Sequence, residues 1–152
     1  MKPMNCRIAA LQMGSGPRVD DNLKVAAHLI VEAVAQAAQL LVLPEYFPII
    51  GAADVDRVKA SETFGQGPIQ DWLSSQAKQH GVWIVAGSIP LVADAPGKMR
   101  NSTLVFDGQG RCVARYDKIH LFAFQKGDES YDESAFIEAG KAPVTVDTPF
   151  GR

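Results

Sequence analysis

The 152-residue chain is predicted to adopt an α/β fold. Short apolar runs typical of buried strands alternate with amphipathic segments typical of helices. Two further strand-like segments then flank the turn residues Asp107–Gly110, which is typical of a hairpin. A strand, a helix and a strand within about 40 residues form a βαβ unit, in which the two strands run parallel. We therefore expect parallel strands in the first half and an antiparallel pair in the second.

The first βαβ unit begins with Arg7–Met13, a largely apolar segment that predicts a strand buried on both faces. Gly14–Pro17 ends this strand. The acidic and amide residues at 20–22 are candidate N-caps, and their charge suits the positive end of a helix of about 18 residues. Leu40–Leu43 is the second strand. The helix is predicted from apolar residues at helical spacing, namely Leu23, Ala27, Ile30, Val34 and Ala37.

A second helix and a third strand follow. Pro68 suits the first turn of a helix, and Gly81 after His80 suits its end as a glycine cap. Val82–Ser88 then predicts a third buried strand, and Asp94–Lys98 predicts a polar loop.

The last third of the chain begins with the predicted antiparallel strands Asn101–Phe106 and Arg111–Tyr116. Asp117–Ala142 is a long stretch without a regular pattern, and irregular segments of that length are usually functional or disordered. Val144–Val146 predicts one more strand.

Composition excludes several classes of protein. A net charge of −2 and a pI near 5.9 offer no attraction to nucleic acid or to an anionic membrane. The chain has no run of about 18 apolar residues for a membrane span, and its N-terminus lacks the pattern of a secretory signal. We therefore expect a cytoplasmic protein. Cys6 and Cys112 are too few and too far apart for a disulfide framework or a zinc site.

Glu45 is the first candidate for chemistry because it follows a strand that ends in the core. Ligand sites open at the carboxyl ends of strands in α/β sheets. Burial against Tyr46 and Phe47 would raise the pKa of Glu45 and make it a usable base. The alternative is a solvated or ion-paired glutamate.

Lys118 is the second candidate. It stands at a predicted strand end within the apolar and aromatic frame of residues 116–122. Fixed in a dry pocket, its ammonium would stabilise an oxyanion. The alternative is a lysine whose stem packs while its charge reaches water.

Neither cysteine is a convincing nucleophile. Cys112 lies six residues before Lys118, which is about 20 Å along a strand. Cys6 opens the first strand and is expected to pack or to face solvent. Most of the acidic residues in the long stretch should be solvated, and spacing does not choose which of them enters a pocket. These acids are Glu129, Asp132, Glu133 and Glu138.

A dinucleotide-binding unit is a weaker alternative for the same early residues. Gly14–Gly16 precedes a helix, and Glu45 would then bind a ribose hydroxyl. Against it, Val19 stands at the third glycine position and Pro17 removes an amide from the phosphate cradle.

Taken together, four motifs resemble the nitrilase, or carbon–nitrogen hydrolase, superfamily. The segment YDKIHLF (116–122), followed by ESAFIEAG (133–140), is most similar to its amidase branch, which includes deaminated-glutathione amidase and omega-amidase. The motifs are LPEYF (43–47), GVWIVAGSIP (81–90), RNSTLVFDGQG (100–110) and RYDKIHLF (115–122).

The resemblance implies an α-β-β-α sandwich of which residues 1–152 form roughly the N-terminal half, as a single domain. It assigns Glu45 as general base, Lys118 as the oxyanion-stabilising lysine and Glu133 as a second glutamate beside the site. The family's nucleophilic cysteine follows the strand that begins near Asp147–Gly151, so it is expected beyond Arg152.

The implied reaction is hydrolysis of a small carboxamide to ammonia and a carboxylic acid through a thioester, without metal or organic cofactor. The resemblance also implies a homodimer or larger homo-oligomer. The 152-residue chain alone is expected to be inactive. An alternative of another class is a non-catalytic fragment or subunit that needs a complementary half, which predicts exposed sheet edges and an unfinished core.

Overall fold

The computed structural model describes residues 6–152, so the first five residues of the N-terminus that was predicted to lack a signal lie outside it. The helices are α1 (Val19–Ala35), α2 (Asp54–Lys59), α3 (Pro68–His80) and the 3₁₀ turn η1 (Glu133–Ala135). The strands are β1 (Ile8–Ala10), β2 (Leu40–Val42), β3 (Trp83–Val85), β4 (Ile89–Val92), β5 (Met99–Phe106), β6 (Cys112–Asp117), β7 (Ala123–Lys126) and β8 (Glu129–Asp132).

The main sheet is mixed, as the sequence predicts. Strands β1, β2 and β3 are parallel neighbours, and β5 runs antiparallel to β3, β4 and β6. β3 and β4 pair with successive parts of β5, so the chain between them bends at residues 86–88 while staying on the same side of β5. The α/β prediction, the parallel pairing and the antiparallel pair β5–β6 are confirmed.

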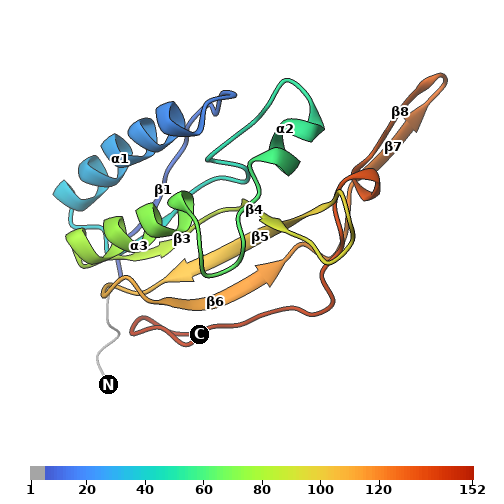
Figure 1. Ribbon diagram of the computed structural model, residues 1–152. Coiled ribbons are helices and arrows are strands. Elements are labelled where there is room, and N and C mark those ends of the chain that lie inside the picture. The colour runs from blue at the N-terminus through green and yellow to red at the C-terminus, as the bar shows by residue number, and fades with distance from the viewer. Residues whose placement is uncertain (1–5) are drawn as a thin grey trace.

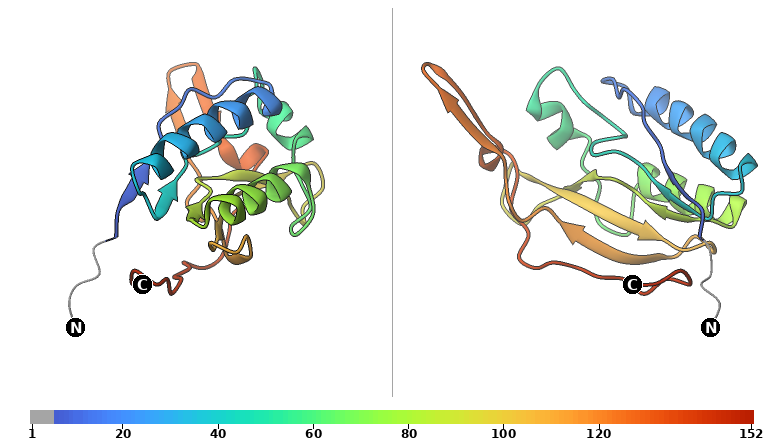
Figure 2. Two further views of the ribbon diagram at one scale, coloured as in Figure 1. Left: turned by 90° about the vertical axis from the view of Figure 1, so that its left-hand side faces the viewer. Right: turned by 180° about the vertical axis from the view of Figure 1, so that it is seen from behind.

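Helices α1 and α3 cover one face of this sheet (Figures 1 and 2). The core lies between them and the sheet, where Leu41, Ile84 and Phe106 are paired across three strands and are at most 3% exposed. α3 begins at Pro68 and ends at Gly81, which has the left-handed conformation of a C-cap, as predicted.

The opposite face of the sheet is much less covered. Ile8 in β1 is 59% exposed, so the prediction that the first strand is buried on both faces is wrong. The reason is that β1 is a three-residue edge strand that pairs only with β2, and α1 covers only one of its faces. Most residues of the segment 144–152 line a shallow hollow on this second face together with Ile8, Leu40, Val85 and Val105.

The start of α1 also differs from the prediction. The helix begins at Val19 after Arg18, so Asp20 and Asp21 lie in its first turn and are not N-caps. Asn22 is buried and its amide bonds instead to the main chain of Gly16 and to the carbonyl of Pro48. The acidic residues nevertheless stand at the positive end of the helix, as expected.

The stretch after β6 is more regular than the sequence indicates. β7 and β8 form a hairpin that projects from the body of the molecule, and η1 follows it (Figures 1 and 2). The two strands are only four residues each and are joined by a tight turn, so the sequence shows no clear alternation of apolar and polar residues there. Val144–Val146, by contrast, forms no strand, because it lies over the face of the sheet and not along an edge.

Gly87 permits the close approach of two segments at the bend between β3 and β4. Its φ is +50°, and a Cβ there would lie 2.0 Å from the carbonyl oxygen of Pro44 and 2.3 Å from that of Leu43. No residue with a side chain fits this position without movement of the backbone that leads into Glu45.

We predict that Gly87→Ala lowers the free energy of unfolding by about 3 kcal/mol or more, because left-handed strain and a backbone clash add. Urea denaturation measures this change. Gly97→Ala is the matched control, since Gly97 has a φ of +73° but nothing within 4 Å of the added Cβ. The control should cost about 1 kcal/mol from strain alone. Equal losses in the two variants would contradict the close approach at Gly87.

Candidate active site

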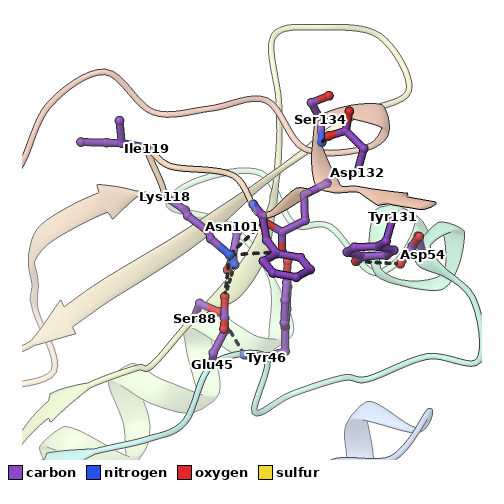
Figure 3. A network of polar contacts seen from close by, with 12 residues as sticks. Glu45, Tyr46, Asp54, Ser88, Asn101, Lys118, Ile119, Tyr131, Asp132 and Ser134 are labelled. Carbon is purple, nitrogen blue, oxygen red and sulfur yellow. Dashed lines mark hydrogen bonds and ion pairs between the residues drawn. The ribbon is translucent and has the colours of Figure 1, made fainter. Parts of the chain in front are cut away.

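Glu45, Lys118 and Glu133, the three side chains that the resemblance assigns to the site, meet at one end of the main sheet, and Figure 3 labels the first two of them. The ammonium nitrogen Nζ of Lys118 lies 3.3 Å from Oε1 of Glu45. The same nitrogen lies 2.9 Å from Oε2 and 3.1 Å from Oε1 of Glu133. Of the acids in the stretch after β6, Glu133 is therefore the one that reaches Lys118, which spacing alone could not choose.

Glu45 leaves the sheet just after β2 and Pro44. Its Oε1 accepts a hydrogen bond from Nδ2 of Asn101 at 2.7 Å as well as the one from Lys118. The side chain of Glu45 is 57% exposed and paired with Lys118, so it is the solvated, ion-paired glutamate that the sequence left open as the alternative and is not buried against Tyr46 and Phe47. Both rings turn into the core instead, and the carboxylate lies in a hollow open to solvent.

Tyr46, directly after Glu45, has an unusual backbone conformation. Its φ is +53°, a left-handed value that is costly for an aromatic residue. Its N–H donates a hydrogen bond of 3.0 Å to Oγ of the buried Ser88, which follows the Gly87 bend. Burial raises the pKa of the Tyr46 phenol, so this hydroxyl stays neutral. The strained turn fixes the direction in which Glu45 leaves the sheet.

The main chain of Lys118 is held on both sides. Its N–H donates to the carbonyl of Asn101 at 2.9 Å, and its carbonyl accepts from the N–H of Gly140 at 2.8 Å. Gly140 packs so tightly that a Cβ there would lie 2.1 Å from the carbonyl oxygen of Asp117. Lys118 therefore extends the pairing of β6 by one residue and directs its side chain into the hollow.

Glu133 is the buried member of the group, with a side chain that is 7% exposed. Besides contacting Lys118, its Oε2 accepts a hydrogen bond of 2.7 Å from the N–H of Phe122. The N–H of Glu133 in turn donates to the carbonyl of Phe122 at 3.0 Å. These two bonds close the base of the β7–β8 hairpin, so the residue that contacts Lys118 also fixes the hairpin.

Electrostatics keep Lys118 charged. Burial by itself lowers the pKa of Lys118, but the hydrogen bond to Glu133 and the negative charges of Glu45 and Glu133 outweigh it. The net result is a pKa above its ordinary value. Lys118 is therefore a hydrogen-bond donor at neutral pH and not a base.

The hollow has a volume of about 220 Å³. Asn101 is 3% exposed, and sequence reasoning assigned it no role although it donates to Glu45. The signal was available, since four successive polar residues, 100–103, stand in a strand whose other residues are apolar. The lining residues are Glu45, Gly87, Ser88, Asn101, Thr103, Tyr116 and Lys118.

The dinucleotide alternative does not fit this arrangement. The N–H of Gly16, which a phosphate would need, already donates to Oδ1 of Asn22 at 2.8 Å. Glu45 is engaged by Lys118 and Asn101.

Within residues 6–152, no group of three His, Cys, Asp or Glu side chains is placed to hold a metal ion, and none of the helices is both long and apolar enough to cross a membrane.

Comparison with known proteins gives consistent matches over almost the whole chain. The sequence model of the Carbon-nitrogen hydrolase family matches residues 7–152. The chain is 36% identical over 151 residues to deaminated glutathione amidase of Yersinia enterocolitica, covering 97% of this chain and 52% of that protein. It is 33% identical over 147 residues to omega-amidase NIT2 of Homo sapiens, covering 96% and 52%. The chain thus spans about half the length of these relatives.

Solved structures agree with this match. Saccharomyces cerevisiae Nit3, a member of branch 10 of the nitrilase superfamily, superimposes with a TM-score of 0.81 at 28% identity, over 96% of this chain and 52% of that one. A variant of the amidase from Nesterenkonia sp. AN1, with acrylamide added at its active site cysteine, superimposes with a TM-score of 0.78 at 26% identity. This match covers 97% of this chain and 55% of that one. The predicted sandwich family is confirmed over about half of its fold.

We predict that Glu133→Gln lowers the pKa of Lys118 toward 10.5, the value without partners, because one of two negative charges is removed. NMR of the lysine Cε–H groups during a pH titration measures this pKa. Glu129→Gln, on an exposed position of β8, is the control and should leave it unchanged.

The same variant should change stability with a definite sign. A raised folded-state pKa contributes stability that is fully present below the unfolded pKa and is lost as the pH rises through the folded pKa. The free energy of unfolding of wild type should exceed that of Glu133→Gln by about 2 kcal/mol near neutral pH. This difference should shrink as the pH rises above 10.5. A difference that stays constant at high pH would show that Lys118 is not its source.

Proposed function

The chain belongs to the carbon–nitrogen hydrolase family, and we propose that it supplies the general base and the oxyanion-stabilising lysine of an amidase that releases ammonia from a small carboxamide. Glu45 is the base, Lys118 stabilises the oxyanion, and Glu133 holds Lys118 in place and charged. The 152 residues act as one domain of this family.

One observation carries the proposal. A single ammonium group, that of Lys118, lies within hydrogen-bonding distance of two carboxylates at the mouth of a hollow. A lysine kept protonated beside a pocket is a donor for negative charge that develops on a carbonyl oxygen. Oε2 of Glu45 makes no hydrogen bond to the residues that the structure describes, so it is free to accept a proton.

The chemistry follows in two halves. Glu45 takes the proton of a cysteine thiol, the thiolate attacks the amide carbonyl carbon, and Lys118 stabilises the tetrahedral oxyanion. The oxyanion collapses, the carbon–nitrogen bond breaks, and Glu45 returns its proton to the leaving ammonia. Glu45 then deprotonates a water that attacks the thioester, the carbon–sulfur bond breaks as the carboxylic acid forms, and Glu45 returns this proton to the thiolate.

The nucleophile of this reaction is not Cys112. That thiol lies at the start of β6, about 20 Å along the strand from Lys118. Although Cys112 as a residue is exposed, partial desolvation of its sulfur raises the pKa of the thiol, which favours the protonated form over the nucleophilic thiolate. Cys6 precedes β1 and is half-buried. The cysteine is therefore supplied by residues other than these 152, and the chain alone is inactive.

A small amide is the substrate class that the relatives favour, since the two curated relatives are named deaminated glutathione amidase and omega-amidase. Assembly as a homodimer or larger homo-oligomer stays a prediction. No metal or organic cofactor enters the proposed steps.

We predict that Glu45→Gln and Lys118→Met each lower ammonia release by the full-length protein about 10³-fold, because one removes the base and the other the oxyanion donor. A coupled ammonia assay with a small ω-amide measures the rate. Glu129→Gln removes a carboxylate that lies outside the hollow and should keep the wild-type rate. Rates within tenfold of wild type for either site variant would refute the assignment.

We also predict that the 152-residue chain releases no ammonia from the same amide, because no cysteine among residues 6–152 lines the hollow at Glu45. The assay compares this chain with the full-length protein at equal concentration. Turnover by the chain alone would overturn the assignment of the nucleophile while leaving the roles of Glu45 and Lys118 to the variants above.

A further inference from the structure

A second polar cluster lies behind the proposed site. We call it the Arg57 cluster, and it consists of Arg57, Asp54, Tyr46, Tyr131 and Phe136. Its members come from α2, from the turn after Glu45, and from the segment that carries Glu133. In Figure 3 the hydroxyl of Tyr131 lies beside Asp54, and Tyr46 stands between them and Glu45.

The guanidinium of Arg57 is enclosed by this cluster. Its side chain is only 13% exposed and forms an ion pair with Asp54 in the preceding turn of α2. Its Cζ lies 4.6 Å from the ring centre of Tyr46 and 5.2 Å from that of Phe136. Nη2 also contacts the hydroxyl of Tyr131 at 3.4 Å. A planar guanidinium suits such stacking, and an ammonium does not.

Each of the two rings that Arg57 contacts is linked through the main chain to one of the site carboxylates. Tyr46 directly follows Glu45, and Phe136 closes the η1 turn by donating its N–H to the carbonyl of Glu133 at 3.1 Å. A shift of either ring therefore moves a carboxylate relative to Lys118. Arg57 itself does not line the hollow.

Tyr46 depends on this contact more than an ordinary core residue. Its left-handed backbone tends to relax toward negative φ. Its hydroxyl is buried and has no hydrogen-bond partner among residues 6–152, so no polar contact orients the ring. The ring is held by packing and by the attraction between the guanidinium and its π face.

We propose that Arg57 is a positioning residue for the proposed amide hydrolysis, holding Glu45 and Glu133 at the spacing at which both contact the ammonium of Lys118. The inference rests on the proposed function for its catalytic consequence, but its geometric part concerns the three side chains whether or not the chain is an amidase. Arg57 acts through Tyr46 and Phe136 and touches no reacting atom.

The test uses the full-length protein with Arg57→Met, which keeps the stem but removes the charge, and Arg57→Lys, which keeps the charge but loses the planar stack. Lys59→Met is the matched control, because Lys59 is an exposed cation on the same helix. Circular dichroism checks folding. Two readouts follow: the pKa of Lys118 from NMR titration, and kcat separately from KM with a small ω-amide.

Arg57→Met is expected to lower kcat about 10- to 100-fold with KM changed less than about threefold, since misplacement by about 1 Å has effects of this size. The pKa of Lys118 should fall in the same variant. Arg57→Lys should lose less kcat and lower the pKa of Lys118 less than Arg57→Met does, without reaching the wild-type values. Lys59→Met should match wild type in both. If Arg57→Met does not fold, the comparison of Arg57→Lys with Lys59→Met decides in the same way.

The outcomes separate the two proposals. Wild-type values of kcat and of the Lys118 pKa in both Arg57 variants would overturn the positioning role while leaving an active amidase. A fall in the Lys118 pKa in a protein without amidase activity would support the positioning role and refute the proposed function. A fall in kcat with an unchanged Lys118 pKa would also overturn the inference, because the loss would then not come from the carboxylates.

Discussion

The contact of one lysine with two carboxylates is the interaction on which the rest of this structure depends. Lys118 extends β6, Glu45 follows β2, and Glu133 follows the β7–β8 hairpin, so three separate segments meet at one nitrogen. Lys118 is 73 residues from Glu45 along the chain. Only a sheet that brings β2 and β6 to the same end unites them. Two negative charges around one ammonium keep it protonated, which is what a donor to an oxyanion requires.

The backbone around this contact is constrained on every side. Gly87 lets the β3–β4 bend approach the carbonyls of residues 43 and 44. Tyr46 adopts a left-handed conformation that Ser88 and Arg57 support, and Gly140 packs on the main chain before Lys118. Strain at such positions persists only where the surroundings hold it, and it commonly gathers at functional sites. The constraint explains how an exposed carboxylate keeps a fixed direction.

The two faces of the main sheet differ in how well they are covered. One face packs under α1 and α3, while on the other face Ile8, Val85 and Val105 border a hollow together with residues of the segment 144–152. The apolar character of β1 and β3 on both faces suits a layer enclosed from two sides. The relatives, of which this chain spans about half the length, share this fold over the matched part.

The sequence by itself determined the α/β class, the parallel start of the sheet, the limits of α3 and the two residues Glu45 and Lys118. These follow from local period, from glycine and proline at helix ends, and from motif order, all of which are carried by neighbouring residues. It did not determine the exposure of β1, the hairpin β7–β8, or the partners of Glu45. Spacing did not choose among the four acids, and although motif resemblance pointed to Glu133, only the tertiary structure gave its distance to Lys118 and brought Asn101 to the hollow and Arg57 against Tyr46. Pairings between residues far apart in the chain depend on how elements pack, and no local pattern contains that information.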